Sequence, residues 1–372
     1  MTTSYHLINV AVLDDYQGVA LSIVDWSKVS DRANITVFQD HLEDQAALAE
    51  RLAPFDVVCI MRERTPMPAS LLERLPRLKL IASTGSRNAS IDLAAVAERG
   101  ITVAHTSYTS TPTIELTWAL ILASARHIWS EATSLRNGGW QCSLGDDLAG
   151  KTLGIIGLGN IGSGVAKVGL AFGMNVIAWS QNLTASVATA AGARLVSKDE
   201  LLRTADVVSI HMVLSRRTIG LIGATEFALM KSSARLVNTS RGPLVVEAAL
   251  LDALVSHRIS GAAIDVYDVE PICLPRLISV MFRAVSMNAS IVTPSPTSAP
   301  GSTKSSQAMG SSSLNKSAQT STNEHCSTSD RAGRAGRARR CLARDAQHQG
   351  RPWHGVSHEL HALVHAFARD RG

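Results

Sequence analysis

The sequence lacks both a long hydrophobic run and a paired-cysteine motif. No apolar stretch approaches the roughly 18 residues needed to cross a membrane, so we expect no membrane association. The N-terminal segment MTTSYHLINVAVLDD has neither the basic start nor the apolar core of a secretion signal, and we therefore expect a cytoplasmic protein. Five cysteines lie at irregular spacing without a CxxC pair, which predicts reduced thiols and no metal site.

Excess basic charge is also absent from most of the chain. The net charge is +5, but the residues after Pro271 contain 13 Lys and Arg against 5 Asp and Glu, a net of +8. The totals of 36 and 31 leave 23 and 26 before that point, a net of −3. The basic run RAGRAGRARR has no interleaved aromatic residues, so we interpret it as a solvated charge run and expect no nucleic-acid partner.

Short β-branched runs alternate with helix-like segments through the first third of the chain. This alternation is typical of a parallel α/β sheet. The expected strands are INVAVLDD at 8–15, NITVFQD at 34–40, FDVVCIM at 55–61, LKLIAST at 78–84 and ITVAHT at 101–106.

A second α/β series follows a long apolar helix predicted at 114–128. Its expected strands lie within KTLGIIGLGNIG at 151–162, NVIAWS at 175–180, ADVVSIHM at 205–212, ARLVNTS at 234–240 and GAAIDVY at 261–267. The fold class is therefore α/β with two doubly wound parallel-sheet domains. We expect a first domain at 1–112, a dinucleotide-binding domain at 113–290 and a tail at 291–372.

The tail has a different composition from the rest of the chain. Residues 291–329 are rich in Ser, Thr, Pro and Ala and have few large apolar side chains, so they cannot bury enough surface to fold alone. We expect this low-complexity tail to be disordered. The abrupt change after Pro271 suggests the hypothesis of a divergent or frame-shifted C-terminal quarter, which translating the other reading frames of the coding DNA would test.

A glycine-rich turn stands between an expected strand and an expected helix. Gly157, Gly159 and Gly162 form GxGxxG in the strand–turn–helix context that binds the pyrophosphate of NAD or NADP. We assign this turn, with Asn160 and Ile161, to cofactor binding.

The strand that follows the glycine turn should end near the adenosine ribose. An Asp or Glu there would favour NAD and an Arg would favour NADP, but the strand ends in Ser180, Gln181 and Asn182. Ser180 and Asn182 could hydrogen-bond either ribose, and a polar turn explains them equally well. The cofactor is therefore NAD or NADP.

Four stretches together resemble the D-isomer-specific 2-hydroxyacid dehydrogenase family. They are TGSRNASIDL from Thr84, ADVVSIHMVLS from Ala205, VNTSRGPLVVEAAL from Val237 and GAAIDVYDVEP from Gly261, and the resemblance covers about residues 5–271. It implies a flavodoxin-like substrate domain, a Rossmann domain, and hydride transfer between NAD(P)H and a small 2-oxo or 2-hydroxy acid.

The resemblance also implies roles for individual residues. Arg241 would bind the substrate carboxylate and polarise the carbonyl, a task for which a planar guanidinium is suited, and Glu270 would support a catalytic His. The substrate carboxylate would also meet the backbone of Thr84, Gly85 and Ser86. Asp265, Thr239 and His211 would border the cofactor, although His211 alone is typical of a structural strand-end residue. Arg62 and Asn88 are expected near the same sheet edge, where they could line the pocket, although a solvated loop explains each of them better.

The chain departs from the family pattern at the position of the catalytic His. The family has TPH there, whereas this sequence has Thr293, Pro294 and Ser295. The alternative to an active dehydrogenase is therefore a catalytically impaired NAD(P)-binding homologue. The resemblance further implies a homodimer formed through the helix at 114–128 and Trp140, although burial of that helix within one monomer explains the same residues.

Overall fold

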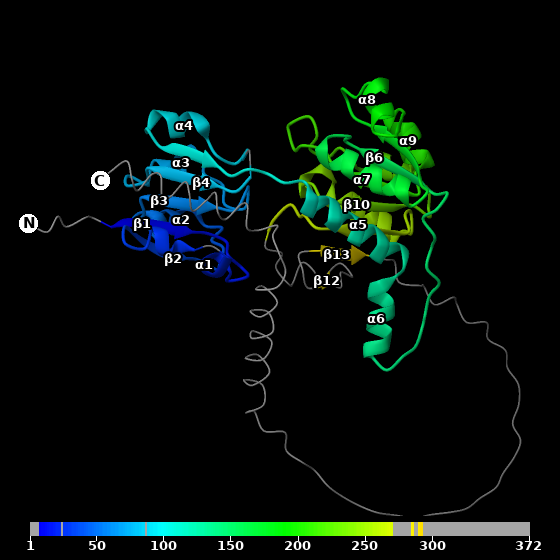
Figure 1. Cartoon of the computed structure of the whole chain (residues 1–372), viewed down its shortest axis with the longest axis horizontal. Helices are drawn as coiled ribbons and strands as arrows, with labels where there is room; N and C mark the ends of the chain where they lie inside the picture. The colour runs from blue at the N-terminus through cyan, green and yellow to red at the C-terminus, as the bar shows by residue number, and fades with distance from the viewer. Residues whose placement is uncertain (1–6, 24, 86–87, 271–283, 286–288, 293–372) are drawn as a thin grey trace, which may run out of the picture. The chain divides into compact units, whose positions relative to one another are not determined.

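The computed structural model describes residues 7–23, 25–85, 88–270, 284–285 and 289–292. Two parallel sheets carry the described chain (Figure 1). Ser86, Ser295 and all but the first two residues of the tail expected at 291–372 lie outside the described residues. The predicted boundary after residue 112 falls in the first turn of a helix, and the one after residue 290 falls inside a strand that the sequence pattern did not predict.

The first sheet has the strand order β2-β1-β3-β4-β5, with every neighbouring pair parallel. This is the flavodoxin-like order, and it confirms the predicted fold class for this part of the chain. Its strands are β1 (Ile8–Val12), β2 (Ala33–Val37), β3 (Val57–Ile60), β4 (Leu80–Ser83) and β5 (Thr102–His105). Its helices are α1 (Ala20–Ile23), the 3-10 turn η1 (Trp26–Lys28), α2 (Gln45–Leu52), α3 (Ala69–Leu72) and α4 (Leu93–Glu98).

Aspartates begin two of these helices. The Asp44 carboxylate accepts a hydrogen bond from the Ala47 amide at 2.7 Å, and Asp92 accepts from the amides of Ala94 and Ala95. Both satisfy donors that a helix start leaves unpaired. The β3 and β4 strands are buried along their whole length, which explains their nearly continuous apolar sequence.

The second sheet has the order β12-β13-β11-β10-β9-β6-β7-β8. When β6 to β11 are counted as strands 1 to 6, the part β8-β7-β6-β9-β10-β11 of this sheet has the Rossmann order 3-2-1-4-5-6. Its strands are β6 (Thr152–Ile156), β7 (Asn175–Trp179), β8 (Arg194–Leu195), β9 (Val207–Ile210), β10 (Arg235–Asn238), β11 (Gly261–Ile264), β12 (Ala284–Val285) and β13 (Ala289–Val292). The short β8 and β12 were not predicted because two residues give no readable alternation, and β13 was not predicted because it lies after Pro271, where the regular α/β pattern ends.

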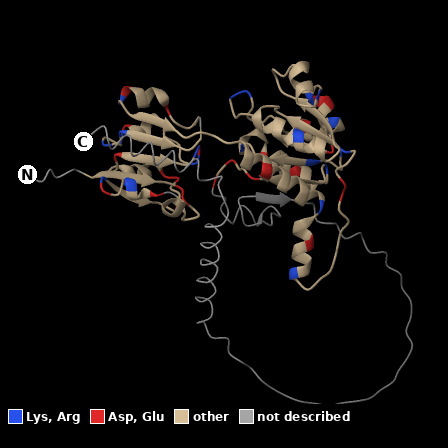
Figure 2. Cartoon of the chain, in the orientation of Figure 1, with Lys and Arg blue, Asp and Glu red and all other residues tan. Residues whose placement is uncertain are grey.

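The helices of this second half cover the Rossmann sheet. They are α7 (Asn160–Ala171), α8 (Ala185–Ala190), α9 (Lys198–Thr204), α10 (Ala224–Leu229), the 3-10 turn η2 (Gly242–Leu244) and α11 (Glu247–Val255). In the view of Figure 2, acidic and basic residues are interspersed along the described elements. None of the described helices is long and apolar enough to cross a membrane.

The long helix predicted at 114–128 is two helices in the structure. α5 (Thr111–Ala125) ends before His127, whose φ of 51° breaks the helix, and α6 (Ile128–Arg136) follows. Trp118 of α5 is 5% exposed and donates its indole N–H to the Val165 carbonyl of α7 at 3.2 Å. α5 is therefore part of the Rossmann core, whereas α6 has no buried residue.

Candidate active site

The candidate residues gather at the carboxyl ends of parallel strands. In open α/β sheets this edge is where ligands bind. The residues that follow the strands are Arg62 after β3, Thr84 and Gly85 after β4, Gly157 after β6, Ser180 after β7, His211 after β9, Thr239 and Arg241 after β10, and Asp265 after β11.

The glycine turn after β6 is shaped by close backbone contacts. Gly157 has a φ of 99°, donates its amide to the Trp179 carbonyl at 2.8 Å, and leaves no room for a Cβ beside the His211 carbonyl. A Cβ on Gly162 would meet the Gly157 carbonyl. The strand β6 and the helix after the turn can therefore approach each other this closely only if both residues are glycine.

Gly159 differs from its two neighbours because nothing lies within 4 Å of the place where a Cβ would stand. It is exposed and begins α7 without a side-chain cap, and Asn160 beside it is exposed too. Ile161 follows, partly buried against the core. The start of α7 is thus open at Gly159 and has no side-chain cap, which fits the pyrophosphate of a dinucleotide.

The end of β7 forms a polar turn. Ser180 accepts a hydrogen bond through its backbone carbonyl from the Leu183 amide at 3.1 Å, and Asn182 is exposed. Both side chains are therefore compatible with a ribose and with an ordinary turn.

A network of hydrogen bonds holds the turn after β10. Asn238 bridges the turn, accepting from the Ser240 amide at 3.0 Å and donating to the Arg241 carbonyl at 2.9 Å. The Ser240 hydroxyl donates to the Ile210 carbonyl at 2.8 Å, and the Thr239 hydroxyl lies 2.8 Å from that of Thr117. Sequence reasoning named Thr239 but missed Asn238 and Ser240, although both stand in the same NTSRG motif.

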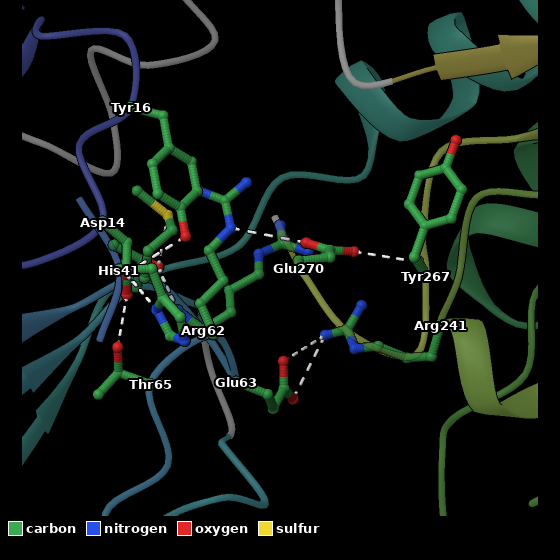
Figure 3. Close-up of polar contacts among 12 residues, drawn as sticks. Asp14, Tyr16, His41, Arg62, Glu63, Thr65, Arg241, Tyr267 and Glu270 are labelled. Carbon is green, nitrogen blue, oxygen red and sulfur yellow. Dashed lines mark hydrogen bonds and ion pairs between the residues drawn. The ribbon is translucent and has the colours of Figure 1, made fainter. Parts of the chain in front are cut away.

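The Arg241 guanidinium is 32% exposed at the end of this turn. One of its terminal nitrogens donates to the Ser240 carbonyl at 2.7 Å. The other lies 3.0 Å from a carboxylate oxygen of Glu63, as Figure 3 shows. Nothing in the sequence around Glu63 pointed to this contact, because 178 residues separate the pair.

Glu270 contacts both its own chain segment and an arginine of the first half. Its carboxylate accepts a hydrogen bond from the Tyr267 amide at 3.1 Å (Figure 3). It also lies 3.6 Å from the Nε of Arg64. Ser295, at the position of the family's catalytic His, lies outside the described residues.

Asp265 carries a buried carboxylate oxygen, Oδ1, with no hydrogen-bond partner in the described structure. Burial, with the negative charge of Glu270, raises the pKa of this carboxyl to about 7, while Arg62 and Arg64 act in the opposite direction. An unpaired buried acceptor is what a donor group of a bound ligand would satisfy, and the place of Asp265 beside the cofactor stays a prediction.

We expect Asp265→Asn to gain stability over the unmodified protein as pH rises. A carboxyl with a raised pKa destabilises the fold only after the unfolded chain has ionised, so the penalty is absent below about pH 4 and complete above about pH 7. Urea denaturation across this window should show the difference in unfolding free energy growing by on the order of 4 kcal/mol. A difference that stays constant with pH would mean that folding leaves the pKa of Asp265 unchanged.

His211 forms one hydrogen-bond contact and leaves one ring nitrogen unpaired. Its Nε2 lies 2.9 Å from the Ser209 hydroxyl, and its buried Nδ1 has no partner in the described structure. Burial lowers the pKa of the imidazole to about 4, so the ring is neutral at physiological pH. Its carbonyl packs against Gly157, so its backbone lies beside the glycine turn.

The loop after β4 holds two of the three residues predicted to bind the substrate carboxylate. Gly85 has a φ of 88° and donates its amide to the Thr106 hydroxyl at 2.8 Å, and Thr84 accepts the Arg62 amide at 3.1 Å. The solvated loop expected for Asn88 is wrong, because Asn88 is 7% exposed. Its side-chain amide donates to the Arg62 carbonyl at 2.5 Å, a pairing that compensates for burial.

Comparisons with known proteins agree with this geometry. Residues 118–294 match the model of the D-isomer specific 2-hydroxyacid dehydrogenase, NAD binding domain. A hydroxypyruvate reductase of Thermotoga maritima is 37% identical over 244 residues, which cover 65% of this chain and 78% of that protein. The crystal structure of a phosphoglycerate oxidoreductase from Vibrio cholerae matches with a TM-score of 0.69 and 37% identity, covering 72% of this chain and 86% of that one.

The chain belongs to the D-isomer specific 2-hydroxyacid dehydrogenase family, with a Rossmann domain of its NAD-binding type. A glyoxylate reductase of Aeropyrum pernix is 43% identical over 213 residues, which cover 54% of this chain and 63% of that protein. A D-3-phosphoglycerate dehydrogenase of Methanocaldococcus jannaschii is matched over 43% of its length. This chain thus spans less than two thirds of these two relatives.

Proposed function

We propose that this chain is an NAD(P)-dependent oxidoreductase that transfers hydride between the nicotinamide and a small 2-oxo or D-2-hydroxy acid. The observation that carries the proposal is the position of Arg241. It extends a partly exposed guanidinium from the strand-end edge that also holds the glycine turn and Asp265. Relatives named as glyoxylate and hydroxypyruvate reductases support the same substrate class.

Different residues at the edge of the Rossmann sheet would bind different parts of the cofactor. The first amides of α7 would hold the pyrophosphate, Ser180 and Asn182 would meet the ribose, and Asp265 would accept from the nicotinamide amide. The bound nicotinamide supplies the hydride. Thr239, fixed by Thr117, would border the ring.

Arg241 would bind the substrate carboxylate and polarise the carbonyl that receives the hydride. Two parallel N–H donors of a guanidinium match the two oxygens of a 2-oxo acid, a geometry that a lysine does not reproduce. The backbone at Thr84, Gly85 and Ser86 would complete the carboxylate site, with the ligand replacing the Thr106 hydroxyl as the acceptor of the Gly85 amide. Glu270 would support the group that supplies the proton accompanying reduction, the role that the resemblance gives it beside a catalytic His.

The test is oxidation of NADH and of NADPH by the purified full chain with glyoxylate, pyruvate and hydroxypyruvate. We expect consumption of the reduced nicotinamide with at least one acid, and the preferred cofactor follows from the comparison. Binding of NADH without turnover of any acid would overturn the proposal and favour the catalytically impaired homologue, since loss of acid–base catalysis costs about 10²- to 10⁴-fold.

We also propose a homodimer. Large apolar side chains are exposed on α6 and in the segment after it, namely Ile128 at 53%, Leu135 at 52%, Trp140 at 74% and Leu144 at 92%. A second copy would remove this apolar surface from water. Sedimentation should give twice the chain mass, and Leu144→Asp should shift it toward the monomer. A monomeric wild-type protein would refute the dimer.

The cytoplasm is the proposed location. Cys142 is exposed and free, and Cys59 is buried and free, which suits a reducing compartment. Fractionation of the source cells should recover the protein with cytoplasmic markers, and recovery elsewhere would contradict this.

A further inference from the structure

Glu63 presents Arg241 with the same chemical group that the proposed substrate would bring. Its two carboxylate oxygens lie 3.0 and 3.4 Å from one terminal nitrogen of the guanidinium. The pair is 29% and 32% exposed, so an anion from solvent can reach it. In this structure the Glu63 carboxylate already pairs with the Arg241 guanidinium.

The loop that carries Glu63 is held on both sides. Before it, the Arg62 amide donates to the Thr84 hydroxyl and the Arg62 carbonyl accepts from Asn88. Arg62 also has a φ of 52°, a left-handed conformation that a non-glycine residue adopts only where its surroundings impose it. After Glu63, the Thr65 hydroxyl donates to the Asp14 carboxylate at 2.6 Å. These contacts restrain the backbone on both sides of Glu63 and so limit where its side chain can lie.

The buried carboxylate of Asp14 holds the end of this loop in place. It is 1% exposed, lies 2.9 Å from Nδ1 of His41 and accepts from the Tyr16 hydroxyl at 3.3 Å (Figure 3). The Tyr16 ring in turn lies 5.0 Å from the Arg64 guanidinium. A buried carboxylate with several partners is costly to rearrange, so it anchors Thr65 and the residues before it.

The negative charge of Glu63 lies near two arginines, Arg62 and Arg241. Burial lowers the pKa of Arg62, the nearby positive charge of Arg241 adds to that effect, and the negative charge of Glu63 opposes it. A substrate carboxylate placed on Arg241 would provide the same compensation. A negative charge near these guanidinium groups, from Glu63 or from a ligand, therefore favours the charged form of Arg62.

We propose that Glu63 is an internal competitor of the substrate carboxylate and thereby sets the affinity of Arg241 for 2-oxo acids. The inference rests on the proposed function and adds a residue that determines substrate affinity. A partly exposed ion pair is weak, so a ligand that brings a carboxylate and a carbonyl together displaces it. Removing the competing charge should tighten ligand binding by about 3- to 10-fold.

The experiment measures binding of oxamate to the full chain at saturating NADH, by calorimetry, for the unmodified protein, Glu63→Gln and Glu63→Asp. Glu63→Gln should bind oxamate about 3- to 10-fold more tightly, and Glu63→Asp should lie between it and the unmodified protein because its carboxylate reaches less far. Glu73→Gln is the matched control, since Glu73 is exposed and forms no ion pair in the described structure. NADH affinity and thermal stability, measured in parallel, verify that each variant is folded.

An unchanged or weaker affinity in Glu63→Gln overturns the inference, because a residue that positions Arg241 would lose affinity when neutralised. An equal gain in Glu73→Gln overturns it as well, because net charge would then be the cause. If oxamate binds equally to the unmodified protein and Glu63→Gln, the proposed function stands and this inference alone fails. If oxamate binds to no variant, both fail.

Discussion

Replacing Arg241 with alanine is expected to lower kcat/KM for a 2-oxo acid by about 10³-fold while NADH affinity stays within about twofold. The guanidinium would bind the carboxylate and stabilise the negative charge that develops on the carbonyl oxygen during hydride addition. Its loss removes both effects at once. Steady-state kinetics with the best acid found for the unmodified protein provide the measurement, and NADH fluorescence reports cofactor binding.

Two further variants show whether the effect belongs to the guanidinium. Arg241→Lys keeps the charge but not the paired donors, so it should recover only a small part of the activity. Arg194→Ala removes an exposed arginine, 62% exposed and paired with Glu200, and should leave kinetics unchanged. Near-normal turnover in Arg241→Ala would contradict the role assigned to this residue.

Replacing Gly159 with valine is expected to weaken NADH binding by at least about 100-fold with little change in thermal stability. Nothing in the described structure lies within 4 Å of the added Cβ, and the backbone there is compatible with other residues. The side chain would instead fill the space before the first amides of α7, where the pyrophosphate should lie. Fluorescence titration and thermal melting measure the two effects separately.

Gly157→Ala serves as the contrasting variant. Its φ of 99° and the adjacent His211 carbonyl leave no room for a methyl group, so this variant should lose stability in addition to cofactor affinity. If Gly159→Val bound NADH normally, the first turn of α7 would not be the pyrophosphate site. Equal destabilisation of both variants would instead place Gly159 among the packing glycines.

The local pattern of the sequence was sufficient for the strands of both sheets and for the glycine turn. Alternation of β-branched runs and helical segments, with GxGxxG directly after a strand, depends on neighbours within a few residues. The order of the strands confirmed the doubly wound fold. Short β8 and β12 were missed because two residues carry no periodic signal, and β13 was missed because it lies beyond Pro271, where the regular pattern of the sequence ends.

Only the tertiary structure decided what surrounds the charged residues. The sequence placed Arg241 and Glu270 by motif, but their contacts with Glu63 and Arg64 join segments that are far apart along the chain. Asn88 looked like a loop residue because a hydrophilic stretch gives no sign of a buried partner, yet it is buried against the Arg62 carbonyl. Hydrogen bonds and ion pairs depend on distances in space, whereas the periodicity of a sequence records only which side chains face the core. The sequence therefore determined the fold, and the fold determined which polar side chains pair with one another.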